Sequence, residues 1–471
     1  MYTNNIELNL NDVYNSDPEK FINKKYTFNN SEYNIIKYNK ELLTKYKDNE
    51  DEFNFMSKFR SVVIQNNKVI TYSPGKSINY EKFIEKYSIN NSWVEDFIDG
   101  TMINVFYDKI NKIWEIATKS TVGGNISFFN DIKNYNYFTN NQNNQNNVNN
   151  ENNENNVNNE NNVNNENNEN NENNENNDYT FRSMFFEACN LNNLNLNTLN
   201  TNYTYTFILQ HPLNRIVTPI TIPSIYLIKV YEINNIGENK ASIKELNLQN
   251  FISSLPYVFL NTNVKFINKY SINDNFDSVK NYYTSNEIPY YCVGCMIYNE
   301  DGTRTKLRNN NYEIVRKLRG NHPKLQYNYL CLKQENKIKE FLYYYPEHNY
   351  IFNKFKIKTF QYTNQLFMNY ISCFIRKEKH LKEYEFQFKN HMYKLHEKYK
   401  TELKPNKKSI DKKFVIDYFN QLHPAQQMFV INYSRETASK AITSEETTLN
   451  ATNSEETKDV NMNTESVVLV N

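Results

Sequence analysis

The most informative polar residues of the sequence follow a predicted strand that ends in a proline turn. The run reads Tyr205-Thr-Phe-Ile-Leu-Gln-His-Pro-Leu-Asn-Arg-Ile-Val217, so Asn214 and Arg215 stand directly after the turn. An amide and a planar guanidinium at a strand edge suit the recognition of phosphate or ribose groups. Taken alone, such an arginine would more often pair with a carboxylate inside a sheet.

Two cations alternate on another predicted strand. Lys306 and Arg308 stand at positions i and i+2, so both side chains lie on one face of an extended chain. Like charges on one face are usually solvated, but a pair that faces a cleft could bind a triphosphate. Asp99 and Gly100 form a generic hairpin turn when taken alone. Lys119 follows a third predicted strand and is a further cationic candidate.

In their order along the chain, these segments resemble the motifs of the phage-type ATP-dependent RNA ligases, members of the covalent nucleotidyltransferase superfamily. The resemblance extends to ligase-related proteins of large DNA viruses, and it spans roughly residues 59 to 330. The run Tyr205 to Val217 is similar to the third motif of the family. The segments similar to the other motifs are Phe97-Ile-Asp-Gly-Thr-Met-Ile-Asn104, Trp114-Glu-Ile-Ala-Thr-Lys-Ser-Thr-Val-Gly123, Cys292-Val-Gly-Cys-Met-Ile297 and Thr305-Lys-Leu-Arg308.

The sequence departs from the family at the positions that perform its chemistry. The family begins catalysis with a lysine amine that attacks the α-phosphate of ATP, and the corresponding residue here is Phe97. Two glutamates of the family correspond to Ile208 and Val293. Carboxylate oxygens are the ligands that Mg²⁺ requires, so ATP is an expected ligand whereas Mg²⁺ is a doubtful one.

The residues that remain would hold phosphate groups without reacting with them. The resemblance implies a nucleotide- or phosphate-binding set of Asp99, Lys119, Asn214, Arg215, Lys306 and Arg308. We therefore expect a protein that binds nucleotide phosphate or RNA and has lost the lysyl-adenylate chemistry, and no catalytic residue is assigned. Two alternatives stay open. One is an active RNA ligase in which Lys76 or Lys119 has become the nucleophile, and the other is a structural or virion-associated protein that reuses the fold.

The clearest local basic cluster lies between residues 316 and 324. Interleaved cations and aromatic rings suit a single RNA strand, through neutralisation of its backbone and stacking of its bases. A solvent-facing helix end would have the same composition. The predicted RNA-binding residues are Arg316, Lys317, Arg319 and Lys324, with Tyr312, Tyr327 and Tyr329 as aromatic neighbours.

The pattern of predicted elements favours an α+β fold, with an antiparallel-rich nucleotidyltransferase core and a helical C-terminal domain. Short β-rich runs recur over residues 61–70, 101–107, 114–118, 203–210, 225–232, 293–298 and 303–307, and a helical period extends from about 360 to 433. The expected parts are an N-terminal segment (1–50), the first part of the core (51–139), an Asn-rich insert (140–178), the second part of the core (179–335), the helical domain (336–433) and a tail (434–471).

Composition limits the remaining classes of function. The insert and the tail are so poor in apolar residues that both are expected to be disordered. The formal net charge of +1 produces no global field that would attract nucleic acid. Five scattered cysteines indicate free thiols in a reducing compartment, and the Cys292–Cys295 pair lacks the further ligands of a zinc site. No apolar run is long enough to cross a membrane, so we expect a soluble cytoplasmic protein, in a host cell or a virion.

Overall fold

The computed structural model describes residues 2–128, 179–254 and 256–433. The predicted insert and tail lie outside these residues. Two compact units divide the chain, Met1–Pro323 and Lys324–Asn471, whereas the sequence placed the corresponding boundary between residues 335 and 336. The fold is mixed α+β with mainly antiparallel sheets, which confirms that part of the predicted class.

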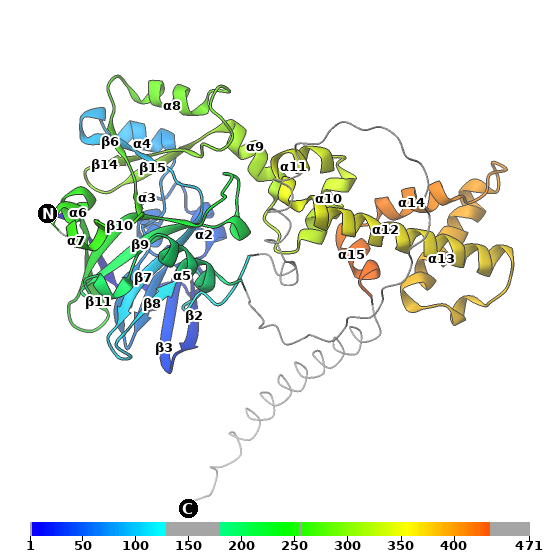
Figure 1. Cartoon of the computed structure of the whole chain (residues 1–471), viewed down its shortest axis with the longest axis horizontal. Helices are drawn as coiled ribbons and strands as arrows, with labels where there is room; N and C mark the ends of the chain where they lie inside the picture. The colour runs from blue at the N-terminus through cyan, green and yellow to red at the C-terminus, as the bar shows by residue number, and fades with distance from the viewer. Residues whose placement is uncertain (1, 129–178, 255, 434–471) are drawn as a thin grey trace, which may run out of the picture. The chain divides into compact units, whose positions relative to one another are not determined.

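The largest sheet of the first unit contains seven strands (Figure 1). Its order is β1 (Tyr2–Asn9), β11 (Lys240–Leu246), β10 (Ser224–Asn235), β9 (Tyr203–Gln210), β7 (Thr101–Asp108) and β8 (Ile113–Ala117), with β12 (Lys265–Phe266) parallel to β10. Helix α5 (Phe181–Leu191) is amphipathic and buries Phe181, Phe185 and Cys189 against one face of this sheet. A capping box formed by Thr180 and Ser183 fixes the start of the helix.

A four-stranded antiparallel sheet covers the other face of the large sheet. Its strands are β2 (Phe21–Phe28), β3 (Ser31–Tyr38), β4 (Val62–Gln65) and β5 (Lys68–Tyr72). Val62, Val69 and Tyr72 pack against Tyr231 and Ile243 of the large sheet. The β-rich run predicted over residues 61–70 forms two strands, because Asn66 and Asn67 both have positive φ and turn the chain into a β4–β5 hairpin.

The third sheet positions the cationic strand. It consists of β13 (Lys269–Ser271), β6 (Ser92–Asp96), β14 (Gly294–Asn299) and β15 (Arg304–Arg308). Helices α4 (Tyr80–Lys86) and α8 (Phe276–Thr284) cover one face through a core that includes Phe83, Phe276 and Leu307. The other α-helices in the described part of this unit are α1 (Leu10–Tyr14), α2 (Lys40–Lys45), α3 (Glu50–Ser57), α6 (Leu248–Ser254), α7 (Pro256–Phe259) and α9 (Asn310–Arg319).

The second unit is helical over its described residues. Its helices are α10 (Leu325–Gln334), α11 (Ile338–Tyr344), α12 (Asn349–Tyr370), α13 (Phe386–Lys398), α14 (Lys412–Gln421) and α15 (Pro424–Ile431). Leu366, Met392, Val415 and Phe419 form the centre of its core. None of the helices described in either unit combines the length and apolar character that a membrane span needs.

Candidate functional site

Strand β15 presents three cations on one face. Arg304, Lys306 and Arg308 alternate with the buried Thr305 and Leu307, because successive side chains of a strand point to opposite faces. The guanidinium of Arg304 donates to the Tyr298 hydroxyl (3.0 Å) and to the backbone carbonyls of residues 74 (3.2 Å) and 75 (2.6 Å). Arg304 therefore holds the loop before α4 against the strand.

That loop brings Lys76 to the same face. The Lys76 amide donates to the carbonyl of Ser57 (2.9 Å), and the Ile78 amide donates to the carbonyl of Arg304 (2.9 Å). Both bonds fix the backbone of the loop, and the Lys76 side chain is half-buried. The charges of Arg60, Arg308 and Arg304 lower the pKa of the Lys76 side chain, so this amine lies within electrostatic range of β15.

Three further cations approach from the four-stranded sheet and from the turn after β8. Arg60 precedes β4, and Lys37 lies near the end of β3 and donates to the Ser120 hydroxyl (3.0 Å). The ammonium of Lys119 lies 5.2 Å from the ring centroid of Tyr38, a cation–π contact. We call Lys37, Arg60, Lys76, Lys119, Arg304, Lys306 and Arg308 the cation cluster.

Burial, together with repulsion from neighbouring cations, lowers the pKa values of the lysines in the cation cluster. Burial, followed by the charges of Lys76 and Arg308, lowers the pKa of Lys306 to about 7. Burial, followed by the charge of Arg60, lowers the pKa of Lys119 to about 8. The pKa of Lys76 is lowered in the same way. These ammonium groups therefore lie in a field that favours loss of their protons.

Most cations of the cation cluster have no carboxylate partner in the described part of the chain. Within the described part of the chain, Lys37, Arg60, Lys76, Lys119 and Lys306 have no ion pair. Arg308 differs, because one of its terminal nitrogens lies 2.8 Å from a Glu313 carboxylate oxygen, yet its buried Nε has no hydrogen-bond partner.

A buried lysine elsewhere in the same unit provides the contrast. Lys229 lies 2.7 Å from Glu245 and 3.8 Å from Glu95, and the attraction of these carboxylates outweighs burial and raises its pKa. The fold thus supplies carboxylates to a buried cation that has a structural role. In the cation cluster, by contrast, several cations are partly buried close together and have no carboxylate partner.

Three of the predicted phosphate-binding residues have a different role from the cation cluster. The Asp99 carboxylate accepts hydrogen bonds from the backbone amides of Val217 and Thr218 (2.9 Å each) and from the Tyr312 hydroxyl (2.8 Å). Asn214 donates to the Thr101 hydroxyl (2.7 Å). The Arg215 guanidinium donates to the Val217 carbonyl (2.9 and 3.1 Å). Asp99, Asn214 and Arg215 therefore organise the turn after β9, whereas Lys119, Lys306 and Arg308 belong to the cation cluster.

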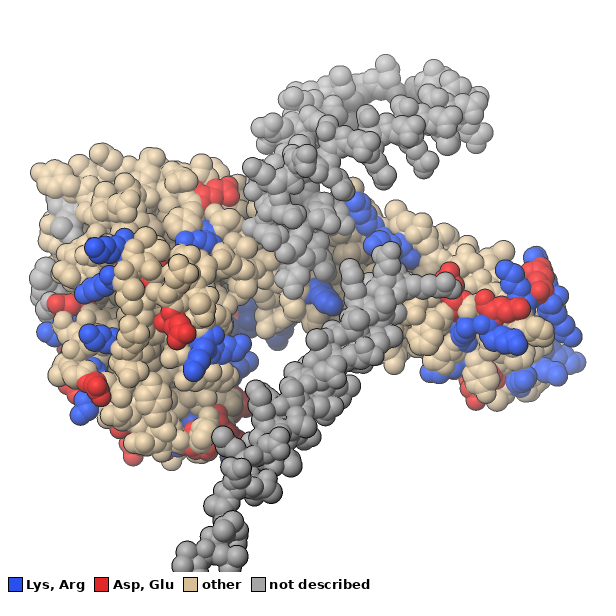
Figure 2. Space-filling view, turned by 90° about the horizontal axis from the view of Figure 1, so that it is seen from below, with Lys and Arg blue, Asp and Glu red and all other residues tan. Residues whose placement is uncertain are grey.

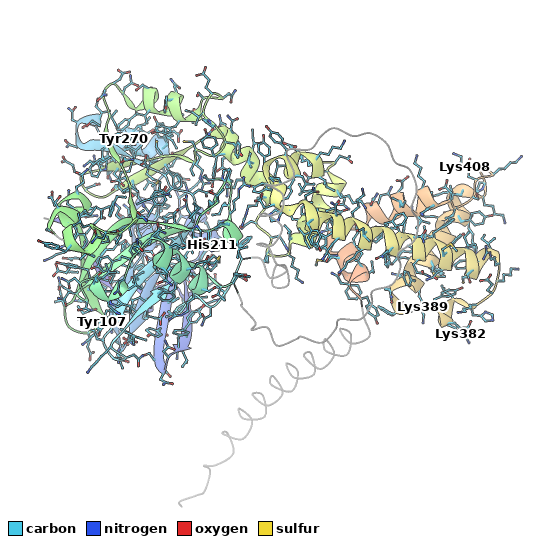
Figure 3. The ribbon with its side chains drawn as sticks, in the orientation of Figure 1. Tyr107, His211, Tyr270, Lys382, Lys389 and Lys408 are labelled. Atoms are coloured by element: carbon cyan, nitrogen blue, oxygen red, sulfur yellow. The ribbon has the colours of Figure 1, made fainter. Side chains whose placement is uncertain are left out.

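His211 begins the same turn and also has a structural role (Figure 3). Its ring is completely buried, accepts from the backbone amide of Leu213 (3.2 Å) and lies 3.1 Å from a Glu187 carboxylate oxygen. Burial lowers its pKa, so the imidazole is largely neutral near pH 7.

Apolar side chains occupy the positions that the sequence resemblance would align with a lysine and two glutamates, namely Phe97, Ile208 and Val293. Phe97 is half-buried, and the Arg308 guanidinium lies 5.6 Å from its ring centroid. Val293 is buried, and Ile208 packs against Gly100, where an added Cβ would lie 2.6 Å from the Ile208 side chain. Gly100 has φ +147° and is required for this close approach. Phe97 thus lies beside the cation cluster and supplies no amine.

The predicted RNA-binding residues do not form one free basic face. Arg316 is paired with Glu313 (2.7 Å). Arg319 is buried, donates to the Arg215 carbonyl (3.0 Å) and stacks over the Phe128 ring. Lys317 is exposed on α9, and Lys324 belongs to the second compact unit. Arg316 and Arg319 therefore have structural partners within the first unit.

The second unit has the strongest local excess of positive charge. Residues 324–433 contain 20 lysines and arginines but 10 aspartates and glutamates, although the whole chain has a net charge of only +1. Figure 2 shows basic side chains spread over this unit, and Figure 3 shows Lys382, Lys389 and Lys408 projecting from it. Helix α12 has three lysines and no acidic residue. The sequence-based prediction missed this excess because the acidic insert and tail cancel it in the total.

Sequence reasoning also missed Arg304 and Lys37 of the cation cluster. Arg304 stands two residues before Lys306, so the alternation that identified Lys306 and Arg308 should have identified it as well. Lys37 lies in the N-terminal segment, which has no motif that would indicate it. The five cysteines have free thiols, and no group of His, Cys, Asp or Glu side chains suitable for a metal ion occurs among the described residues.

Comparisons with known proteins do not assign the chain to a family. No protein-family model matches it, and no curated protein matches it significantly.

Proposed function

We propose that this protein binds the phosphate groups of a nucleotide at the cation cluster, in a core related to the nucleotidyltransferase fold of RNA ligases. The observation that supports the proposal is the partial burial of four cations that have no ion pair, Lys37, Arg60, Lys76 and Lys306, beside the more exposed Lys119. Removing an unpaired charge from water costs several kcal/mol, and a bound polyanion would offset that cost. Phosphate is the common biological anion of sufficient charge, and the motifs around the cluster resemble those of a nucleotide-binding family.

We further propose that the protein does not form a lysyl-adenylate by the mechanism of that family. Phe97 stands at the position of the nucleophile, and Asp99 has its carboxylate occupied by three hydrogen bonds within the protein. The residues that remain can neutralise phosphate oxygens but offer no amine at the usual place. Binding without transfer is the function that this arrangement favours.

Equilibrium binding of ATP tests the proposal. The substitution Arg60→Gln removes a cation whose charge lowers the pKa of Lys76, Lys119 and Lys306, so it should weaken binding about tenfold. Lys68→Gln is the matched control, because Lys68 is exposed at the start of β5 and lies outside the cluster. Equal affinities of the two variants would contradict the proposed site.

An active ligase with a relocated nucleophile is the principal alternative. The lowered pKa of Lys119, about 8, is a property that a nucleophilic amine would need. Incubation with ATP radiolabelled at the α-phosphate distinguishes the two functions, because only the active enzyme would retain the label on a denaturing gel. Loss of that label in Lys119→Arg or Lys76→Arg would then identify the nucleophile.

RNA is a second candidate ligand, and the charge of the second unit supports it. Lys356 and Lys358 are exposed on α12, next to the exposed rings and amides of a helix that has no carboxylate. Replacing both lysines by glutamate should weaken binding of a single-stranded RNA and reduce its salt dependence. If neither ATP nor RNA raises the melting temperature of the protein, a structural role becomes the better explanation.

A further inference from the structure

The carboxylates near the cation cluster are already occupied. Asp99 receives three hydrogen bonds within the protein. Glu313 pairs with Arg308 through one oxygen (2.8 Å) and with Arg316 through the other (2.7 Å). Glu95 accepts from the Trp93 indole (2.9 Å) and lies near Lys229. Each of these carboxylates already has a protein partner that would compete with a metal ion for it.

The positions where the resemblance would place metal-binding glutamates offer no oxygen donor. Ile208 and Val293 have aliphatic side chains, and each is part of the apolar packing or strand pairing of the core. Mg²⁺ demands a nearly octahedral set of oxygen ligands and binds poorly without carboxylates. Among the described residues, the side chains around the cation cluster are therefore mainly positive, whereas a site that binds a metal ion would need carboxylates.

The charge of the cation cluster fits an oligophosphate chain better than a phosphodiester backbone. A triphosphate concentrates about four negative charges within a few ångströms when its terminal group is ionised, whereas each backbone phosphate of RNA has about one. The cluster likewise concentrates its cations. Arg304, Lys306 and Arg308 share one face of β15, and Arg304 holds the loop of Lys76 against that strand. The charge of Arg60 acts on both Lys76 and Lys306. Such a density of unpaired cations needs a compact ligand of high charge.

We propose that the cation cluster binds the metal-free form of an oligophosphate chain of at least three phosphates, and that Mg²⁺ weakens this binding. The proposal rests on the proposed function, and it specifies the ionic form of the ligand at the same site. Lysine and arginine donors neutralise the phosphate oxygens directly and replace the metal in that role. A bound Mg²⁺ would cancel about two of the ligand's charges and would lie among cations that repel it.

The experiment compares the affinity of the full chain for ATP and for inorganic tripolyphosphate in EDTA and in saturating MgCl₂, at constant ionic strength. We expect both ligands to bind at least about tenfold more weakly in MgCl₂. AMP should bind more weakly than ATP in EDTA, because it has fewer charges. In the Arg60→Gln variant the ratio of affinities between the two conditions should move toward one, whereas Lys68→Gln should keep the wild-type ratio.

The possible results separate this inference from the proposed function. Equal or tighter binding in MgCl₂ overturns the inference and leaves nucleotide binding standing. Binding of AMP as tight as that of ATP also overturns it. Absence of ATP and tripolyphosphate binding under both conditions overturns the inference together with the proposed function.

Discussion

Binding of an oligophosphate should be accompanied by uptake of protons, because two lysines of the cation cluster have lowered pKa values. The pKa is about 7 for Lys306 and about 8 for Lys119. A phosphate oxygen beside each amine favours its charged form and raises the pKa again. If both values return to 10 or above, the uptake is about 0.6 proton per ligand at pH 7 and about 1.4 at pH 8.

The same linkage predicts how affinity depends on pH. The complex holds more protons than the free protein, so affinity is greatest below the pKa values of the free lysines and falls as pH rises through them. Between pH 7 and pH 8 the affinity should fall about tenfold. The ligand itself contributes little in this window, since the second pKa of a terminal phosphate is about 6. Titration calorimetry in Tris and in HEPES gives the proton uptake from the difference in apparent enthalpy.

The variant Lys306→Arg assigns the effect to one side chain. Arginine keeps the positive charge but does not titrate in this range, so the variant should bind at pH 7 with about the wild-type affinity. Its proton uptake at pH 7 should fall to about 0.1, the share that Lys119 contributes. Wild-type binding at pH 8 without proton uptake, or the same uptake in the variant and the wild type, would refute the reasoning.

Three other predictions concern stability. The folded-state pKa values of Lys306 and Lys119 are below their unfolded values, so the unfolded chain binds more protons than the folded one. The free energy of unfolding of the ligand-free protein should therefore rise between pH 7 and pH 9. Urea denaturation that shows a fall over this range would contradict the prediction. Asp99→Ala should destabilise the protein by about 2–4 kcal/mol in the same assay, because it leaves two backbone amides and the buried Tyr312 hydroxyl without their acceptor. A loss of stability below about 1 kcal/mol would contradict this prediction. Lys377→Gly should raise the thermal stability by up to about 1 kcal/mol, because Lys377 has φ +58° at an exposed helix end, and calorimetry that shows a loss would disagree.

The parts of the fold that sequence could predict are those in which local pattern and tertiary environment agree. The alternation of β15 places its cations on one face, and the proline turn after β9 lies where the sequence predicts it. The helical period beyond residue 360 corresponds to α12–α15, although the helical unit begins earlier, at Lys324. Here the elements are long and their periods are clear.

The N-terminal segment shows why the rest could not be predicted. Strand β1 pairs with β11, more than 200 residues away, and neither strand has a strong alternation in its sequence. Strand β2 is exposed at most of its positions, so its residues do not reveal which face is buried. The segment expected to be separate therefore contributes strands to two sheets. Pairings of such long range leave almost no local signal.

Sequence spacing could predict a shared face only for site members that lie on one strand. Lys306 and Arg308 share β15, whereas Lys37, Arg60 and Lys119 reach the cation cluster from other elements. The role of Asp99 depends on backbone amides of Val217 and Thr218, more than 100 residues distant. A motif can identify such a residue as important, but its spacing cannot show whether it faces a ligand or the protein's own backbone.

The central claim is that the unpaired charge of the cation cluster is a binding site for phosphate-like anions. Anomalous diffraction from crystals of the full chain soaked in tungstate tests it most directly, because it locates a bound tetrahedral anion without assuming any activity. We predict that the strongest anomalous peak lies within hydrogen-bond distance of the side chains of Lys76, Lys119 or Lys306. A strongest peak at the turn that contains Arg215, or on the second unit with none at the cation cluster, would contradict the account.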